Sequence, residues 1–394
     1  MFNDMKNVYL DHAATTYVRD GVMKIMKPFF IEKYGNPSSF HSVGKEMRDV
    51  VETARDLIAK NLDCRTAEII FTSGGTESDN LAILGVARAN KNKGKHIITT
   101  KIEHPAVLEP CKQLEKEGFE VTYLSVNEDG IVDVKRIKEA LREDTIIVSV
   151  MYANNEIGTI QPITEIAKII RDNTKKEKTG FPVLHTDACQ AVGALDINVL
   201  RLGVDMLTFN GSKIYGPKGI GVLYIKKGIK LEPLIFGGGQ ERGFRSGTEN
   251  IAGIVGLAHA LDLSQKEKDK ENKRLTELRD YLIKELLEKI PNSRLNGDAT
   301  NRLPNNANIS TPRVEGEAMV LYLDSKGIYV ATGSACSSKS LEASHVLLAL
   351  GLPHELAHNS LRFTLGKKTT KNDIDYVIKI VPEIAKKLTE MSSL

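Results

Sequence analysis

Short runs of β-branched and other apolar residues alternate with stretches of helical periodicity between residues 65 and 225. The stretches at 78–89 and 162–172 repeat their apolar positions at helical spacing, as does 47–58 before the first run. The runs predict strands at residues 68–71, 96–100, 121–124, 146–151, 183–186, 206–209 and 221–225. This alternation is typical of an α/β domain built on a mostly parallel sheet.

The pattern changes after about residue 260. A dense run of mixed charge at 264–274 is followed by leucines and isoleucines at helical spacing as far as Ile290. We interpret both parts as one long amphipathic helix whose first half is solvated and which Pro291 ends. A partner-docking surface is the alternative interpretation of the charge run. A smaller α+β region follows, and the sequence contains no internal repeat.

The composition indicates a folded protein that is neither membrane-spanning nor directed at nucleic acid. The chain has 394 residues, enough for two or three domains, and 41% of them are hydrophobic. Lys plus Arg is 54 and Asp plus Glu is 51, so the net charge of +3 does not favour nucleic-acid binding. Apolar runs such as 146–151 are too short to cross a bilayer, and the N-terminal segment lacks signal-peptide features. We expect a cytoplasmic protein with no membrane partner.

The four cysteines are widely spaced and form no CxxC pair, so we expect neither a disulfide framework nor a metal site. Cys64, Cys111 and Cys189 have apolar or helical neighbours, where a thiol packs as a small hydrophobic group. Cys336 instead lies in the small, polar stretch at 332–338, where we expect an exposed and mobile thiol. An inert loop thiol is the alternative.

Polar clusters follow the predicted strands, at the sheet edge where parallel α/β proteins bind ligands. The first cluster, at 72–78, leads from a strand into a helix and offers the N–H groups of Gly75 and Thr76 to an anion such as a phosphate. It is neither GxGxxG nor GxxxxGKS/T, which disfavours a dinucleotide or a nucleoside triphosphate. An N-capped tight turn is the alternative.

Further candidates follow other strands. Asp187, with Gln190 three residues later, suits either a cationic ring nitrogen or the cap of the next helix. Lys213 emerges from a glycine-containing loop, where a lysine among apolar walls forms Schiff bases with carbonyls; a surface lysine is the alternative. His104 and Asn155 follow two more strands and are either site residues or ordinary loop polarity.

An arginine near the C-terminus completes the set. Arg362 lies on a predicted strand, and its guanidinium suits a substrate α-carboxylate, with a surface charge as the alternative. At one sheet edge the chain thus gathers a phosphate-binding turn, a lysine for an aldehyde and an aspartate for a pyridinium nitrogen. These are the groups that bind pyridoxal phosphate.

The chain resembles the cysteine desulfurases, class-V aminotransferases that use pyridoxal phosphate and supply sulfur for iron–sulfur clusters. The matching segments keep the family's order over nearly the whole chain, which is more specific than any single motif. They are YLDHAATT (9–16), YGNPSSFH (34–41), FTSGGTESDN (71–80), EHPAV (103–107), NNEIG (154–158), HTDACQAVG (185–193), KIYGPKGIG (213–221), GGGQERGFRSGT (237–248), TGSACSS (332–338) and LRFTLG (361–366). The short spacing around the cysteine resembles the general iron–sulfur assembly subgroup.

The resemblance implies a fold-type-I architecture that acts as a homodimer. It implies a large cofactor-binding domain at 16–260 and a small domain that combines 1–15 with 261–394. It also implies L-cysteine as substrate and an iron–sulfur scaffold protein of the IscU type as sulfur acceptor. A thiolation protein and a free thiol are the other acceptors, and a transient role of Cys336 as a cluster ligand stays open.

The family's roles carry over position by position. Lys213 is expected to bind the cofactor covalently and to move the Cα proton, and Cys336 to attack the substrate sulfur, leaving a persulfide and alanine. Asp187 is expected to keep the ring nitrogen protonated, and Arg362 to bind the substrate carboxylate. The remaining expected contacts are His104 stacked on the ring as a further catalytic group, Asn155 and Gln190 at its phenolic oxygen with Asn155 also near the substrate, Gly75 and Thr76 at the phosphate, and Thr248 at the phosphate of the other subunit.

The segment before Lys213 departs from the family, which usually has serine, a small residue and histidine there. This chain has Asn210, Gly211 and Ser212, so the phosphate-binding histidine is absent. Ser212 or the Asn210 amide is the expected substitute, but neither carries charge, so we expect weaker cofactor binding than in a histidine-bearing relative. Cys189 is expected beneath the cofactor.

Two rival hypotheses remain: a partner protein without cofactor, and a selenocysteine lyase or aminotransferase that needs no Cys336.

Overall fold

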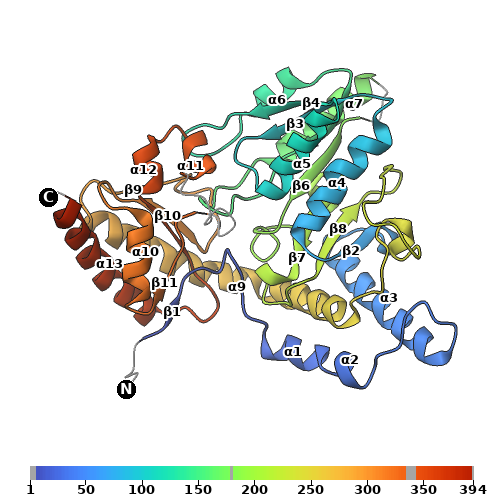
Figure 1. Ribbon diagram of the computed structural model, residues 1–394, viewed down its shortest axis with the longest axis horizontal. Helices are drawn as coiled ribbons and strands as arrows, with labels where there is room; N and C mark the ends of the chain where they lie inside the picture. Colours follow the sequence, from blue (N-terminus) through green and yellow to red (C-terminus); the bar gives the residue numbers. More distant parts are fainter. Residues whose placement is uncertain (1–5, 178–180, 334–342, 393–394) are drawn as a thin grey trace.

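A seven-stranded sheet forms the centre of the computed structural model, which describes residues 6–177, 181–333 and 343–392 (Figure 1). Its strands are β2 (Ile69–Thr72), β3 (His96–Thr100), β4 (Glu120–Leu124), β5 (Thr145–Ser149), β6 (Val183–Asp187), β7 (Met206–Asn210) and β8 (Gly221–Ile225). They lie in the order β2-β8-β7-β6-β5-β3-β4, and only β8 is antiparallel to its neighbours. The predicted mostly parallel α/β fold is confirmed.

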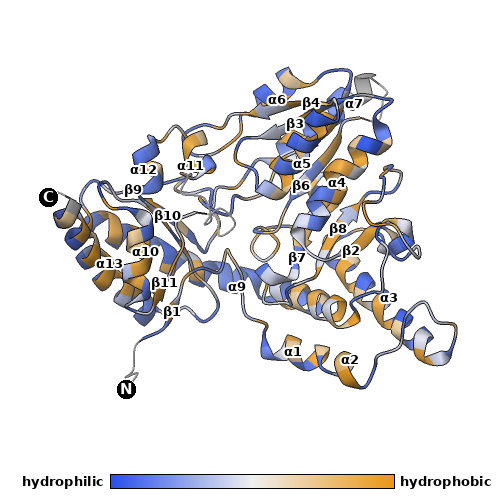
Figure 2. Ribbon diagram, in the orientation of Figure 1, coloured by the Kyte–Doolittle hydropathy of each residue, from blue (hydrophilic) through white to orange (hydrophobic). Residues whose placement is uncertain are grey.

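Helices cover both faces of this sheet because its strands are apolar on both sides. Ile97 packs against α4 and α5, whereas the next residue, Ile98, packs with residues of α3, α7 and α9. Such continuous apolar strands are typical of parallel sheets, and Figure 2 shows the hydrophobic colouring along them. The helices of this region are α1 (Asp20–Met26), α2 (Pro28–Ile31), α3 (Ser42–Leu62), α4 (Gly75–Asn90), α5 (Pro105–Lys116), α6 (Val134–Ala140), α7 (Ile163–Glu177) and α8 (Val199–Leu202).

The longest helix, α9 (Ile251–Lys289), begins earlier than the sequence pattern predicted. Asn250 caps it by accepting a hydrogen bond from the Gly253 N–H at 3.0 Å. Its first turns are buried in the core of the large sheet, and its last turns are buried in a second core. The turns before residue 264 are therefore not solvated, whereas the charge run at 264–274, in the middle of the helix, carries exposed lysines as predicted. The helix ends before Pro291, as predicted.

The second core lies in a smaller α+β region. There β10 (Asn306–Ser310) pairs antiparallel with β9 (Arg294–Leu295) and β12 (Ser360–Thr364), and β1 (Val8–Tyr9) pairs parallel with β11 (Ile328–Tyr329). The remaining helices are α10 (Gly316–Asp324), α11 (His345–Ala349), α12 (His354–His358) and α13 (Lys371–Ser392). Val8 and Leu10 pack into this core. The domain boundaries at 15/16 and 260/261 stay predictions; the second lies inside α9.

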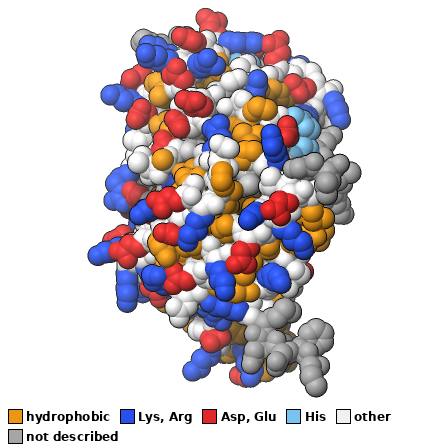
Figure 3. All heavy atoms as spheres, turned by 90° about the vertical axis from the view of Figure 1, so that its left-hand side faces the viewer, with side chains coloured by type: hydrophobic (Ala, Val, Ile, Leu, Met, Phe, Trp, Pro, Cys, Tyr) orange, Lys and Arg blue, Asp and Glu red, His pale blue; other side chains and the backbone are white. Residues whose placement is uncertain are grey.

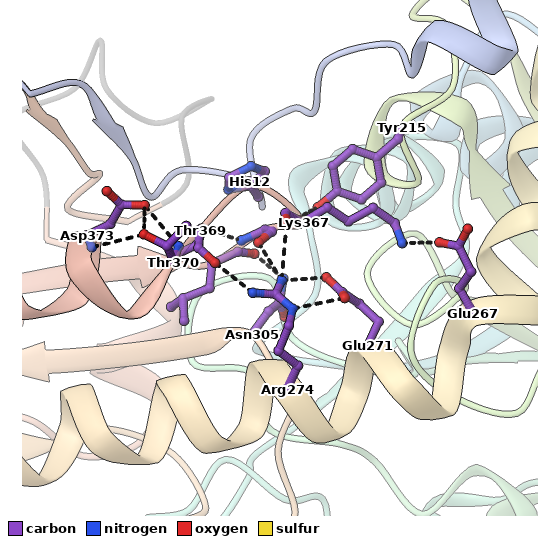
Figure 4. Close-up of polar contacts among 12 residues, drawn as sticks. His12, Tyr215, Glu267, Glu271, Arg274, Asn305, Lys367, Thr369, Thr370 and Asp373 are labelled. Carbon is purple, nitrogen blue, oxygen red and sulfur yellow. Dashed lines mark hydrogen bonds and ion pairs between the residues drawn. The ribbon is translucent and has the colours of Figure 1, made fainter.

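A polar network ties α9 to the segment that follows β12 (Figure 4). Arg274 pairs with Glu271 at 2.7 Å and donates to the carbonyl oxygens of Thr369 at 2.6 Å and Gly366 at 3.0 Å. The backbone N–H of Lys367 donates to the Tyr215 hydroxyl at 2.8 Å. The network therefore fixes the end of β12 relative to the loop of the large sheet that contains Tyr215.

The surface of the smaller region carries charges of both signs. Figure 3 shows lysines, arginines and acidic residues intermixed around apolar side chains on this face, with no large area of one sign. Within the described ranges, no helix is long and apolar enough to cross a membrane. The same residues contain no group of three or more His, Cys, Asp or Glu side chains placed to hold a metal ion.

Candidate functional site

A pocket of about 180 Å³ opens at the carboxyl ends of the parallel strands. Most of the residues that the sequence singled out line it: Gly75, Thr76, His104, Asn155, Asp187, Gln190, Asn210, Ser212, Lys213 and Arg362. Thr248 is not among the lining residues. Cys336 lies outside the described residues. The structure thus brings the predicted site residues together, while the role of each stays a prediction.

The turn between β2 and α4 is shaped for a small anion. A Cβ atom added to Gly75 would lie 2.7 Å from the Cys189 Sγ and 3.0 Å from the Asn210 Nδ2, so only glycine fits here. Thr72 and Ser78 close the turn through a 2.7 Å hydrogen bond between their hydroxyl groups. The first amide groups of a helix have no intrahelical partner and attract negative charge. This turn is therefore suited to a phosphate.

Lys213 ends the short helical turn Gly211–Lys213 that follows β7. Its Nζ donates to the carbonyl oxygens of Ala13 at 2.7 Å and Ala14 at 2.6 Å. The side-chain amide of Gln190 donates to the same Ala13 oxygen at 3.0 Å. The N-terminal segment therefore forms one wall of the pocket and orients the lysine.

Asp187 and His104 are held by local backbone contacts. Asp187 ends β6, is buried, and accepts a hydrogen bond from the Cys189 N–H at 2.8 Å. The ring of His104 caps α5 by accepting from the Ala106 N–H at 3.1 Å. His104 therefore caps α5 and lines the pocket at the same time. Burial raises the pKa of the Cys189 thiol well above its usual value, so this cysteine is a neutral packing group.

Arg362 reaches the pocket from β12, on the smaller region. Its side chain is only 1% exposed and pairs with Asp11 at 2.8 Å, while Nη1 donates to the Asn155 carbonyl oxygen at 3.2 Å. Among the described residues, its buried Nε has no hydrogen-bond partner. A buried donor of this kind is costly unless a ligand satisfies it. The arginine is therefore suited to an incoming carboxylate.

Sequence reasoning missed two acidic residues at this site. Asp11 is the only acidic residue in the otherwise apolar and small stretch 7–18, which is a usable signal. Asp79 also lines the pocket, and its position one helical turn after Gly75 places it on the same face of α4. Asp11 and Asp79 each reach the site from a chain segment that is far in sequence from the residues they approach there.

The unusual segment before Lys213 is neutral. Ser212 donates its hydroxyl to the Asn210 side-chain oxygen at 2.9 Å, and the Asn210 amide contacts the Cys189 sulfur at 3.4 Å. The Asn210 amide lies beside Gly75, and both side chains line the pocket. They offer hydrogen bonds to a phosphate but no positive charge.

Replacing Ser212 by histidine is expected to tighten pyridoxal-phosphate binding roughly tenfold. A hydrogen bond to a charged group contributes about 1.5–3 kcal/mol, and 1.4 kcal/mol corresponds to a factor of ten. Fluorescence titration of the cofactor-free protein measures the dissociation constant. Ser212→Ala is the matched control and should not bind more tightly than the wild type. Equal or weaker binding by Ser212→His would contradict the expectation.

The pocket as a whole fits pyridoxal phosphate. The Gly75 turn provides the phosphate site, Asp187 a carboxylate for the ring nitrogen, and Lys213 an amine for the aldehyde. Arg362 adds a buried donor for the carboxylate of an amino acid. Binding of pyridoxal phosphate and an amino acid accounts for the positions of all four groups: the Gly75 turn, Asp187, Lys213 and Arg362.

Comparison with known proteins agrees with this geometry. The family model for class-V aminotransferases matches residues 8–377. Cysteine desulfurase IscS of Dictyoglomus turgidum is 56% identical over 98% of this chain and 96% of its own length. A solved NifS-like protein is 39% identical, with a TM-score of 0.90, over 97% of this chain and all of that one. A structure described as SspA in complex with cysteine is 35% identical, with a TM-score of 0.78, over 91% of this chain and 99% of that one.

A family match of this extent, together with relatives of more than half identity, establishes the assignment. The enzymes of this group depend on pyridoxal phosphate. The chain belongs to the cysteine desulfurase family of class-V aminotransferases, and its cofactor is pyridoxal phosphate.

Proposed function

We propose that this enzyme removes sulfur from L-cysteine, releases L-alanine and retains the sulfur as a persulfide on Cys336. The observation that carries the proposal is the convergence of Lys213, Asp187 and Arg362, from three separate elements, on one pocket. The name of the Dictyoglomus relative and the cysteine complex of the solved neighbour support L-cysteine as substrate.

Different residues of the chain carry out different parts of the proposed reaction. Pyridoxal phosphate supplies an aldehyde that bonds to amines and a ring that withdraws electrons from the substrate Cα. The Gly75–Thr76 turn would bind its phosphate, and Asp187 would pair with its ring nitrogen. The guanidinium of Arg362 binds the substrate carboxylate and so orients the Cα–H bond toward the amine of Lys213, which moves the proton.

Cys336 performs the sulfur transfer. Its thiolate attacks the substrate sulfur, so that the new S–S bond forms as the C–S bond breaks. The electron pair of the broken bond stays with the carbon fragment, which takes up a proton and leaves as alanine. A thiolate that must carry sulfur to an acceptor belongs on a segment that can reach outward.

The described ends of the segment that carries Cys336 support this role. A Cβ atom on Gly333 would lie 3.2 Å from the Glu156 Oε2, and the Ser344 hydroxyl donates to the same carboxylate. Glu156 follows Asn155, which lines the pocket. Both ends of the segment therefore lie close to Glu156, the residue that follows Asn155, and Ser344 is hydrogen-bonded to it.

A homodimer is part of the proposal. Thr248, which the family places at the phosphate of the other subunit, lies outside its own pocket. It follows the segment with Ile235 and Phe236, whose side chains are 40% and 77% exposed, and Phe30 and Ile31 are also exposed. Apolar surface of this kind is typical of an interface. Sedimentation equilibrium tests the proposal, and a monomeric mass would contradict it.

The proposed sulfur acceptor is an iron–sulfur scaffold protein, and the proposed compartment is the cytoplasm. Cysteine desulfurases of the iron–sulfur assembly subgroup, which the chain resembles, act on such scaffolds. The described cysteines Cys64, Cys111 and Cys189 are free thiols, which suits a reducing compartment.

The visible absorption spectrum of the purified protein, with sulfide assayed before and after L-cysteine is added, tests the proposed function. We expect a cofactor band that changes with L-cysteine, and sulfide release that falls to background in Cys336→Ala. Cys64→Ala, which alters a cysteine outside the pocket, is the matched control and should remain active. Activity retained by Cys336→Ala would favour a selenocysteine lyase or aminotransferase. No band after added cofactor would favour a partner protein.

A further inference from the structure

A second carboxyl group, that of Asp79, lines the same pocket as Asp187, and the proposed reaction does not use it. It comes from the second turn of α4 and lines the pocket, yet its side chain is only 2% exposed. Its Oδ1 has no hydrogen-bond partner among the described residues. An orphaned buried carboxylate oxygen is costly in free energy, so its presence at the site needs a physical explanation.

A row of polar side chains crosses the sheet to reach this group. Ser149 on β5 contacts the Nδ1 of His185 on β6 at 2.9 Å, and the His185 Nε2 contacts the Thr208 hydroxyl on β7 at 3.1 Å. The row reaches Asp79 through His185, whose Nε2 lies 3.6 Å from the Asp79 Oδ1. The three strands are neighbours in the sheet, so the row is continuous.

Counting donors and acceptors shows which atom donates and which accepts at each contact of this row. A neutral histidine has a single ring proton, and the His185 Nε2 is the nitrogen that faces both the Thr208 hydroxyl and the Asp79 Oδ1. The contact with Thr208 is then made by the Nε2–H, and the Nδ1 accepts from Ser149. This assignment needs a neutral imidazole, and burial indeed lowers the pKa of His185 to about 4. The row therefore brings no positive charge to Asp79.

Negative charge accumulates around the same point. Asp187 lies two residues after His185 on β6, and burial together with the charge of Asp187 raises the pKa of Asp79 well above its usual value. Burial raises the pKa of Glu103, which follows β3, to about 8. Three ionised carboxylates this close together repel one another, which favours a proton on the most deeply buried of them.

We propose that Asp79 is a positioning residue that remains protonated, so that Asp187 is the single ionised carboxylate that faces the cofactor ring. Asp187 is the better site for the charge because it lies closer to the opening and accepts the Cys189 N–H. Asp79 takes the proton because it is deeper and its second oxygen is unpaired. The proposal rests on the proposed function, in which Asp187 contacts the ring nitrogen.

Asp79→Asn in the full-length chain tests this directly, because asparagine has the shape of the protonated acid and carries no charge. We expect its dissociation constant for pyridoxal phosphate at pH 7.5 to stay within threefold of the wild type. Asp187→Asn, the matched control, should weaken binding at least tenfold. A loss of tenfold or more in Asp79→Asn would overturn the proposal, because it would mean that the charge of Asp79 is required.

The stability of the two proteins provides a second readout. Because the pKa of Asp79 is raised by folding, its contribution to stability is complete at low pH and is lost as the pH rises. Asp79→Asn should therefore melt at the same or a higher temperature than the wild type at pH 8, with a difference that shrinks toward pH 5. A variant that is less stable at pH 8 than at pH 5, relative to the wild type, would overturn the proposal.

Infrared spectroscopy of the wild type avoids dependence on the folding of a variant. With ¹³C-labelled aspartate, the wild type at pH 7.5 should display the carbonyl stretch of a neutral carboxylic acid, and its absence would overturn the proposal. If Asp187→Asn bound cofactor as well as the wild type, the proposed contact of Asp187 would fail instead, whatever the infrared band shows.

Discussion

Lys213→Ala is expected to lower the rate of sulfide release by about 10³-fold or more. The variant removes the amine that binds the cofactor aldehyde and moves the Cα proton, and positioned proton transfer alone contributes about 10²–10⁴-fold. No other lysine lines the pocket in the part of the chain that the structure describes. Initial rates of sulfide and alanine formation from L-cysteine measure the effect.

Lys218→Ala is the matched control for this experiment. Lys218 lies five residues further along the same loop and donates to the Thr16 carbonyl oxygen at 3.2 Å, so it also contacts the N-terminal segment without lining the pocket. It should retain activity within a few-fold of the wild type. Lys213→Arg keeps the positive charge but does not release a proton, and should be as inactive as Lys213→Ala. A Lys213→Ala variant with a tenth of wild-type activity would contradict the assignment.

Glu241→Gln is expected to destabilise the protein by about 3–5 kcal/mol, because it removes the buried counter-charge of Arg55 and leaves only the half-exposed Glu52, at 3.1 Å from the Arg55 Nε. Arg55 on α3 donates to both oxygens of Glu241, at 2.7 and 2.8 Å, and the two side chains are 4% and 3% exposed. The Glu241 Oε2 also accepts from the Phe71 N–H at 2.8 Å. The midpoint of urea denaturation measures the loss.

A surface pair provides the comparison. Glu120 pairs with Arg142, and their side chains are exposed, so Glu120→Gln should cost less than about 1 kcal/mol. Both substitutions exchange the same groups, but Glu241 is buried and accepts three hydrogen bonds, whereas Glu120 is exposed and contacts only Arg142. Equal midpoints for the two variants would contradict the assignment of a structural role to the buried pair.

Much of the fold follows from patterns that act within a few residues. The strands of the large sheet were predicted to within two residues because each is a short apolar run that ends in a polar cluster. The same clusters led to Gly75, Asp187 and Lys213, because the ends of parallel strands meet at one edge. For these residues, the local sequence pattern and the position at the edge of the sheet indicate the same site.

The features that were missed depend on tertiary packing. The first turns of α9 are apolar around the helix, so no amphipathic period marked its beginning at Ile251. The pair of Asp11 and Arg362 joins the two ends of the described chain. The environment of Asp79 is created by strands β6 and β7, more than a hundred residues away. Such contacts leave no periodic signal in the sequence.

The contact between Asp11 and Arg362 has a consequence for the enzyme while it is being synthesised on the ribosome. The two residues are 351 positions apart, so a ribosome that adds about 5–20 residues per second makes the aspartate roughly 20–70 s before its partner. During that interval the N-terminal wall of the pocket has no arginine to close against. A growing chain therefore cannot seat an amino-acid substrate, and sulfur chemistry begins only after β12 has left the ribosome and folded.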